Sequence, residues 1–262
     1  MPEVMSHRIR IRYDDHGKGE PTLLFMPGWC GSRGVFDELV PRCARRTRTL
    51  ALDWRGHGQS GSTTDDFTTF DLADDALAVI EASRAEQVIP VALSHAGWVA
   101  IELIRRLGSR IPKLVLLDWI VLDAPPPFIG ALQALQDPVQ YLNTREQLFS
   151  LWLQDLDIPA LTRYIRDDMG SYAFQMWARA GREISRAYAK AGSPLQALAA
   201  LDVPVPVMHL YAQPEDPGYL AAQQAFGSAH PWFHVSKLAA RSHFPMYEVP
   251  DEMAMAIERF AT

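Results

Sequence analysis

One serine, Ser94, lies in a turn of the kind that lifts a hydroxyl group into an active site. The segment Ala-Leu-Ser-His-Ala-Gly at residues 92–97 joins an apolar run to a helical pattern, with small residues two positions on either side of the serine. This is a relaxed form of the nucleophile elbow, whose tight backbone admits only small residues there. The elbow aims the positive end of a helix at the hydroxyl, so Ser94 could attack a carbonyl or bind a substrate oxygen. A serine that only caps the helix would give the same local pattern.

A loop near the N-terminus and a histidine near the C-terminus occupy the positions that such a site requires. The loop Pro-Gly-Trp-Cys at 27–30 follows an apolar run. It would supply one backbone N–H of an oxyanion hole, and His95, the residue after the serine, would supply the other. His243 lies between the last predicted strand and a final helix, where the catalytic base of this site belongs. We interpret the turn Trp-Arg-Gly-His-Gly at 54–58 as structural, with its histidine packed rather than catalytic.

The acidic partner of His243 stays open on residue patterns alone. Asp118 ends the strand after the elbow helix, and Asp216 follows the next strand, which is the more common position for the acid. Either carboxylate could orient a histidine and stabilise its charged form. Asp123 and Glu215 are weaker candidates, which we interpret as surface carboxylates.

The elements that must position these residues alternate between strand and helix. Strands are predicted at residues 9–13, 22–26, 47–52, 88–93, 114–117, 205–211 and 233–237, and helices at 70–83, 97–107, 219–226 and 250–260. Strands that are apolar on both faces and alternate with helices indicate a mostly parallel sheet covered on both sides. The first two strands are expected to pair as a hairpin. Residues 125–193 have helical patterns and no strand, which predicts a helical cap inserted into a single α/β-hydrolase domain spanning residues 1–262.

The composition is that of an ordinary globular protein. The 262 residues carry a formal net charge of −6, which argues against nucleic acid or an anionic membrane as the main partner. No stretch approaches the roughly 18 apolar residues of a membrane span, and the N-terminal residues contain no apolar signal region. The two cysteines, Cys30 and Cys43, make no disulfide framework. We therefore expect a cytoplasmic protein, while its oligomeric state stays open.

Motifs for metals and organic cofactors are missing from the sequence. There is no His-Glu-x-x-His, no Gly-x-Gly-x-x-Gly and no phosphate-binding loop. His230 and His234 are four residues apart. They lie on either side of a predicted turn and the start of a strand, so they are a weak candidate pair of metal ligands. We expect neither a metal site nor a cofactor.

Several stretches together resemble one branch of this fold, the cofactor-independent 3-hydroxy-4(1H)-quinolone 2,4-dioxygenases of bacteria. The resemblance spans nearly the whole chain. It rests on seven stretches: Pro-Gly-Trp-Cys at 27–30, Trp-Arg-Gly-His-Gly at 54–58, Ser-His-Ala-Gly-Trp-Val at 94–99, Asp-Trp at 118–119, Gly-Ser-Pro at 192–194, His-Pro-Trp-Phe at 230–233 and His-Phe-Pro at 243–245. The Gly-Trp-Cys loop, the Ser-His-x-Gly-Trp elbow and the Asp-Trp strand end are specific in combination. It implies that Asp118 is the acid, because the family's aspartate lies in the Asp-Trp pair. It also implies that the Trp29 loop and Trp152 of the cap contact the substrate, beside the N–H of His95.

One departure from the family pattern lies directly after the Gly-Trp-Cys loop. Some relatives carry a histidine there, whereas this chain has Gly-Ser-Arg at 31–33. A substrate contact from that histidine is therefore missing, and the substrate preference of the relatives cannot be copied. The length of the substituent at C2 of the quinolone, which in the family ranges from hydrogen to a long alkyl chain, stays open.

The resemblance implies a ring cleavage that needs only the substrate and O2. Enzymes of this family release carbon monoxide and an N-acylanthranilate, and an electron-rich substrate anion can reduce O2 without a metal. His243 would remove the 3-hydroxyl proton, Asp118 would fix its tautomer, and Ser94 would bind a substrate oxygen.

Two other functions are compatible with the same residues. In a serine hydrolase, such as an esterase, Ser94 would attack a carbonyl as the nucleophile. In a binding protein without chemistry, the purified chain would turn over neither quinolones nor esters. Assay of carbon monoxide from a 3-hydroxy-4-quinolone, with and without oxygen, separates the three.

Overall fold

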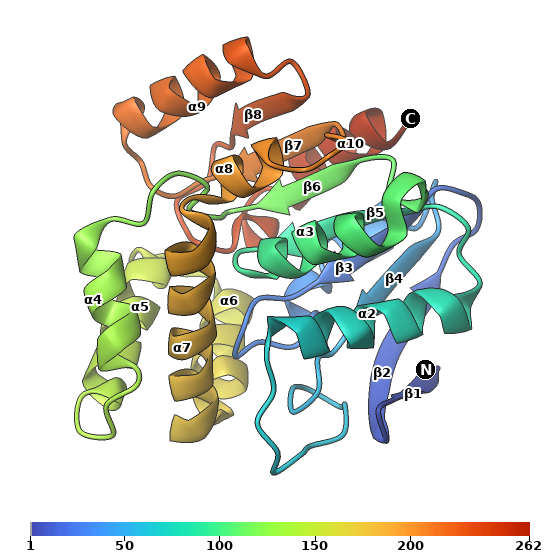
Figure 1. Cartoon of the computed structure of the whole chain (residues 1–262). Helices are drawn as coiled ribbons and strands as arrows, with labels where there is room; N and C mark the ends of the chain where they lie inside the picture. Colours follow the sequence, from blue (N-terminus) through green and yellow to red (C-terminus); the bar gives the residue numbers. More distant parts are fainter. Residues whose placement is uncertain (1) are drawn as a thin grey trace.

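A single mixed sheet forms the centre of the molecule (Figure 1). The computed structural model describes residues 2–262, and over these residues the sheet has eight strands in the order β1-β2-β4-β3-β5-β6-β7-β8. β1 and β2 are antiparallel additions at one edge, and the other strands run parallel. This confirms the predicted fold class. The strands span Glu3–Ser6 (β1), Ile9–His16 (β2), Thr22–Met26 (β3), Thr49–Leu52 (β4), Val88–Leu93 (β5), Leu114–Leu117 (β6), Val207–Tyr211 (β7) and Phe233–Lys237 (β8).

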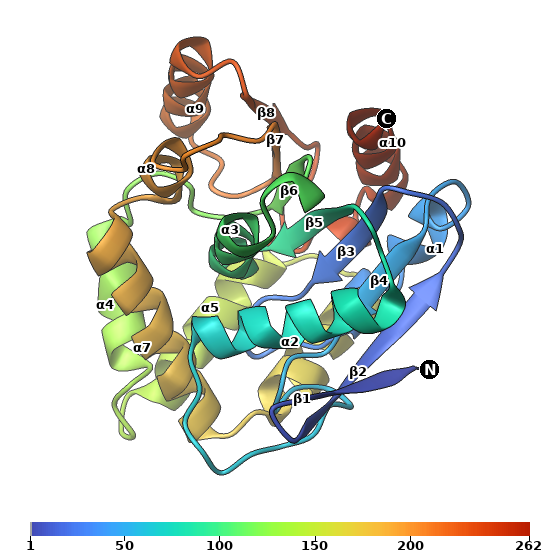
Figure 2. The ribbon, with the colours of Figure 1, turned by 45° about the vertical axis from the view of Figure 1, so that its right-hand side comes forward.

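Helices cover both faces of the sheet, as strands with two apolar faces require. α2 (Thr69–Ser83) and α3 (Ala96–Leu107) pack together on one face, and α1 (Val40–Cys43) and α10 (Pro250–Ala261) pack together on the other (Figure 2). Two further helices of the body are α8 (Pro194–Ala199) and α9 (Pro217–Ala229). Every residue of β3 through β7 is buried, which explains why these strands read as uninterrupted apolar runs.

The predicted hairpin between the first two strands is wrong. β2 pairs with β1 and β4, whereas β3 lies between β4 and β5. Because β3 is buried on both faces, it suits the covered centre of the sheet, where its neighbours run parallel to it. β2 alternates apolar residues with arginines and suits the edge. Its hairpin partner is the short strand β1, which we did not predict.

The residues between β6 and β7 form a helical cap beside the carboxyl ends of the strands (Figure 1). Its helices are α4 (Pro126–Ala134), α5 (Tyr141–Leu153), α6 (Pro159–Arg163), the π-helical turn η3 (Tyr164–Asp168) and α7 (Phe174–Ala191). α4 and α7 approach closely because Gly181 has no side chain; a Cβ there would press on the carbonyl of Leu132. Arg179 and Arg182 form ion pairs with Asp66 in the loop before α2, which attaches the cap to the body.

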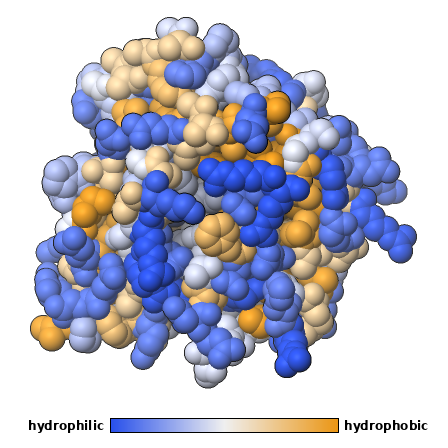
Figure 3. Space-filling view, viewed as in Figure 1, coloured by the Kyte–Doolittle hydropathy of each residue, from blue (hydrophilic) through white to orange (hydrophobic). Residues whose placement is uncertain are grey.

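The apolar side chains gather in one core that continues from the sheet into the cap. On the face of the molecule seen in Figure 3, hydrophilic side chains cover most of the surface and hydrophobic ones occur in small groups. Within residues 2–262, no helix has both the length and the apolar character needed to cross a membrane.

Candidate active site

Ser94 stands at a sharp turn between β5 and α3. Its φ of 53° lies in the left-handed region, which costs a non-glycine residue roughly 1 kcal/mol or more and is found at nucleophile elbows. The Ser94 N–H donates to the carbonyl of Leu117 at 2.8 Å, which ties the turn to the end of β6. Gly97, in the first turn of α3, lies against the Trp119 ring so closely that a Cβ would overlap it. The strand–turn–helix segment therefore has the elbow geometry that its small residues predicted.

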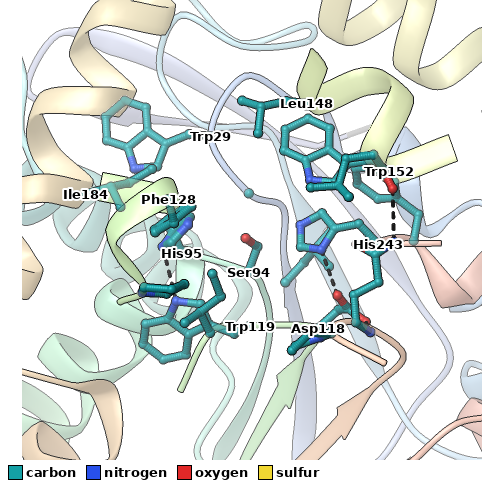
Figure 4. Close-up of a pocket in the computed structure, with 18 of the residues that line it drawn as sticks. Trp29, Ser94, His95, Asp118, Trp119, Phe128, Leu148, Trp152, Ile184 and His243 are labelled. Carbon is teal, nitrogen blue, oxygen red and sulfur yellow. Dashed lines mark hydrogen bonds and ion pairs between the residues drawn. The ribbon is translucent and has the colours of Figure 1, made fainter. Parts of the chain in front are cut away.

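His243 and Asp118 form a hydrogen-bonded pair at the same end of the sheet (Figure 4). His243 Nδ1 and Asp118 Oδ1 are 2.7 Å apart. The other carboxylate oxygen accepts the backbone N–H groups of Ala212, at 2.6 Å, and Gln213, at 3.1 Å. Asp118 is only 1% exposed, so these bonds replace its hydration. The pair leaves His243 Nε2 as the ring nitrogen without a carboxylate partner.

The three remaining acidic candidates stand apart from His243. The Asp216 carboxylate accepts the N–H of Gly218 at 2.8 Å and caps the N-terminus of α9. Asp123 and Glu215 are exposed. All three line the cavity described below, but none forms an ion pair or hydrogen bond with the imidazole.

The Ser94 hydroxyl has no hydrogen-bond partner among residues 2–262 and points toward the open centre of the cavity (Figure 4). It is not bonded to His243, the histidine that would activate it in a hydrolase. The N-terminal loop passes close to the serine, since a Cβ at Gly28 would lie 3.6 Å from that of Ser94. The hydroxyl is thus free to bond with a ligand.

The loop that carries Trp29 is hydrogen-bonded to the turn at residues 54–58. Cys30 has a φ of 56°, and its N–H donates to His57 Nε2 at 3.1 Å. His57 Nδ1 in turn donates to the carbonyl of Arg55 at 2.9 Å. Burial lowers the pKa of His57 to about 4, so the ring stays neutral and can accept the loop N–H. His57 is packed, as expected, and does not line the cavity.

The Trp29 ring forms part of the cavity wall. It stacks on Phe67 with ring centroids 5.7 Å apart and planes 8° apart. The Arg179 guanidinium also lies over the Phe67 ring, 4.1 Å from its centroid. This stack joins the loop, the segment before α2 and the cap helix α7.

His95 also lines the cavity, and its imidazole is held in one tautomer. Its Nδ1 accepts the indole N–H of Trp119 at 3.1 Å, so the neutral ring carries its proton on Nε2. Burial, with a further contribution from His243, lowers the pKa of His95 to about 3. The ring stacks on Phe128 of the cap at a centroid distance of 5.5 Å. His95 can therefore present both its backbone N–H and an imidazole N–H to a ligand.

Trp152 lines the cavity but also contacts His243 directly. The two rings stack with centroids 5.3 Å and planes 23° apart, and the carbonyl of Trp152 accepts the His243 N–H at 3.4 Å. The cap residue therefore supports the histidine as well as the cavity wall.

These residues surround one cavity of about 720 Å³. Its inner lining comes mostly from apolar cap residues that the sequence analysis did not single out, because helical periodicity does not tell a cavity wall from a packed core. They are Phe128, Leu132, Leu135, Leu148, Trp177, Ala180 and Ile184. Its solvent end is lined by polar and charged residues, which are Asp123, Gln154, Gln213, Glu215, Asp216 and Arg241.

The described residues contain no group of three or more His, Cys, Asp or Glu side chains that could hold a metal ion. The two histidines noted in the sequence do not form a site together. His230 Nδ1 bonds the carbonyl of Phe226 at 3.0 Å, and its ring stacks on the Phe226 ring. His234 lies in β8 and is exposed.

Comparison with known proteins identifies relatives over nearly the whole chain. Residues 23–256 match the model of the alpha/beta hydrolase family. The chain is 34% identical over 248 residues to a 2-heptyl-3-hydroxy-4(1H)-quinolone dioxygenase of Mycobacteroides abscessus, covering 94% of this chain and 92% of that one. It is 35% identical over 241 residues to the 1H-3-hydroxy-4-oxoquinoline 2,4-dioxygenase of Pseudomonas putida, covering 92% and 91%.

Solved structures give the same result. An AqdC variant in complex with its substrate, the Pseudomonas quinolone signal, superposes with a TM-score of 0.95 at 32% identity, covering 99% of this chain and 98% of that one. A 1H-3-hydroxy-4-oxoquinoline 2,4-dioxygenase superposes with a TM-score of 0.95 at 33% identity over the full length of both. An esterase from Thermogutta terrifontis, at 19% identity and a TM-score of 0.78, shares the fold alone.

Proposed function

Because this chain belongs to the alpha/beta hydrolase family and, within it, to the 3-hydroxy-4-quinolone 2,4-dioxygenases, we propose that it cleaves the nitrogen-containing ring of a 3-hydroxy-4(1H)-quinolone with O2. The C2–C3 and C3–C4 bonds break and C3 leaves as carbon monoxide. One atom of O2 goes to C2 and the other to C4, which gives an N-acylanthranilate. No metal or organic cofactor takes part. The reaction is cytoplasmic, a setting that suits the two free, buried thiols of Cys30 and Cys43.

The observation that carries this proposal is the His243–Asp118 pair beside a largely apolar cavity. His243 Nε2 removes the 3-hydroxyl proton as a general base. Asp118, at 2.7 Å from Nδ1, keeps the ring in the tautomer that leaves Nε2 free and stabilises the imidazolium. The apolar lining excludes water, so the substrate anion stays poorly solvated and electron-rich toward O2.

Ser94 and the two loop amides bind oxygens of the substrate in this proposal. The Ser94 hydroxyl points into the cavity. The backbone N–H groups of Trp29 and His95 belong to the loops after β3 and β5, which supply the two oxyanion-hole donors in this fold. Trp29, His95 and Trp152 complete the contacts to the aromatic ring.

The hydrolase alternative is disfavoured by one feature of the site. Nucleophilic serine needs a hydrogen bond to its base, and Ser94 Oγ has none to His243 among residues 2–262. The elbow and the acid–histidine pair would serve an esterase equally well, so oxygen dependence is the decisive test.

Chelation is expected to leave the rate unchanged, whereas removal of O2 is expected to abolish it. The protein would be incubated with a strong chelator, desalted and assayed for carbon monoxide in air and under nitrogen. In this proposal the electrons for O2 come from the substrate anion, so no metal is needed. Loss of activity on chelation, restored by one particular metal, would contradict the proposal.

The cavity supports a substrate with a long apolar chain at C2. A volume of about 720 Å³ is in the range of drug-sized ligands and exceeds the need of a bare bicyclic ring. Each methylene buried in the apolar cap contributes about 0.8 kcal/mol. We expect kcat/KM for 2-heptyl-3-hydroxy-4-quinolone to exceed that for the unsubstituted ring by at least about ten-fold.

Ala180→Phe is expected to remove most of that preference. Ala180 lies on α7 and lines the apolar cavity, so a phenyl ring there takes the space of the chain. kcat/KM should fall about ten-fold or more for the heptyl substrate and change little for the unsubstituted one. Ala189→Phe, at an exposed position of the same helix, is the matched control. Equal losses of kcat/KM with both substrates would mean that the heptyl chain binds elsewhere.

A further inference from the structure

The backbone corner that carries Asp118 is strained and held by side chains that lie outside the cavity. Asp118 has a φ of 41°, which an aspartate adopts only when its surroundings enforce it. Its N–H continues the strand ladder by donating to the carbonyl of Leu210 at 2.9 Å. The next N–H, of Trp119, has turned away from the ladder and donates to His209 Nε2 at 3.3 Å.

We propose that His209 and Gln223 are positioning residues that hold the Asp118–Trp119 corner, and through it His243, in the geometry for proton removal. The proposal rests on the role of the Asp118–His243 pair in the proposed function. His209 does not line the cavity, so it acts through Asp118 and not on the substrate.

The hydrogen bonds of His209 and Gln223 allow only one assignment of donors and acceptors. His209 and Gln223 are both 0% exposed, and Gln223 Oε1 lies 2.6 Å from His209 Nδ1. The Gln223 amide nitrogen donates to the carbonyl of Tyr219 at 3.4 Å, which leaves the oxygen to face the ring as an acceptor. His209 therefore carries its proton on Nδ1, and Nε2 is the acceptor that the Trp119 N–H needs.

Helix α9 reaches the same corner a second time through Tyr219. Gln223 lies four residues after Tyr219, so the two share one face of the helix. The Tyr219 hydroxyl donates to the carbonyl of Trp119 and accepts the N–H of Val121, both at 2.9 Å. The segment from 118 to 121 is thus bonded to α9 directly and through His209.

His209 must stay neutral to do this, because a protonated ring has no acceptor. The titratable groups that face it are the Asp118 carboxylate, the Tyr211 phenol, whose ring stacks on it at 5.1 Å, and the Tyr219 phenol. Burial outweighs the hydrogen bond with Gln223 and the attraction of Asp118, and it lowers the pKa of His209 to about 4. The acceptor on Nε2 is therefore present throughout the neutral range.

Removal of the acceptor is the first test. In His209→Phe the Trp119 N–H is buried without a partner, and kcat should fall about ten- to a hundred-fold with little change in KM. In His209→Gln the side-chain oxygen can reach the position of Nε2, and most of kcat should return. The low-field NMR signal of the His243 Nδ1 proton, assigned by its loss in His243→Ala, should shift or broaden in the phenylalanine variant and return in the glutamine variant.

A charge at residue 223 is the second test and does not depend on the folding of His209→Phe. In Gln223→Glu the new carboxylate raises the pKa of His209, so the ring becomes protonated as the pH falls and loses its acceptor. kcat should then decline on the acid side, at a pH where the native enzyme is still active, and recover on the alkaline side. Gln224→Glu, at the adjacent exposed position, adds the same charge as a control and should keep the native profile.

The NMR signal separates this inference from the proposed function. Should the native protein cleave no quinolone, the dependence of the His243 proton on His209 and Gln223 can still be measured. An unchanged signal in folded His209→Phe, or a native pH profile in Gln223→Glu, would overturn the inference even if the ring cleavage is established.

Discussion

Replacement of His243 by alanine is expected to lower kcat by about 10²–10⁴, the usual worth of a positioned general base. The substrate anion forms only if the 3-hydroxyl proton leaves, and within the cavity His243 Nε2 is the group assigned to take it. KM should change less, because the aromatic ring is held mainly by the cavity walls. Single-turnover absorbance under nitrogen would measure anion formation directly, before O2 enters.

Comparison of Ser94→Ala with His243→Ala distinguishes a dioxygenase from a serine hydrolase. Loss of one hydrogen bond to a charged partner costs about 1.5–3 kcal/mol, or roughly ten- to a few hundred-fold in rate. Oxygen-dependent activity should therefore remain measurable. In a hydrolase the serine forms the acyl intermediate and its loss removes almost all catalysis. Detection of a covalent adduct on Ser94 during turnover of a quinolone would contradict the dioxygenase mechanism and support the hydrolase alternative.

Replacement of Asp118 by alanine is expected to lower turnover by two to four orders of magnitude, about 10²–10⁴. The upper end matches the loss seen when the acid of a serine-protease triad no longer fixes the histidine tautomer. Here the carboxylate bonds His243 at 2.7 Å and two backbone N–H groups. Its removal frees the imidazole to rotate or to carry its proton on Nε2, where it cannot act as a base.

Asp216→Ala is the matched control for the acid. Asp216 follows the next strand and caps α9 through the N–H of Gly218, so its loss removes a helix cap worth about 0.5–2 kcal/mol of stability. The melting temperature should fall slightly while kcat stays near the native value. If Asp216→Ala lost more turnover than Asp118→Ala, the assignment of the acid would be wrong.

The fold class, most of the strands and the positions where chemistry could occur can be predicted from the amino-acid sequence. Buried parallel strands need apolar residues on both faces, so runs such as Val88–Leu93 and Leu114–Leu117 are visible without any structure. The small residues around Ser94 are likewise required by local backbone geometry. The motifs at Gly28, Ser94, Asp118 and His243 also indicated the family, which the full-length relatives confirm.

The pairing of the strands and the orientation of the site residues become visible only in the folded protein. β2 and β3 are neighbours in sequence but not in the sheet, because the partner of a strand depends on which faces the rest of the chain covers. Residue patterns left Asp118 and Asp216 open as partners of His243; the bond to Asp118 joins residues 125 positions apart. The orientation of Ser94 away from His243, the tautomers of His95 and His209, and the size of the cavity have the same origin. Each depends on hydrogen bonds and packing between segments that are distant in the sequence. Local residue patterns do not predict which distant groups will come into contact.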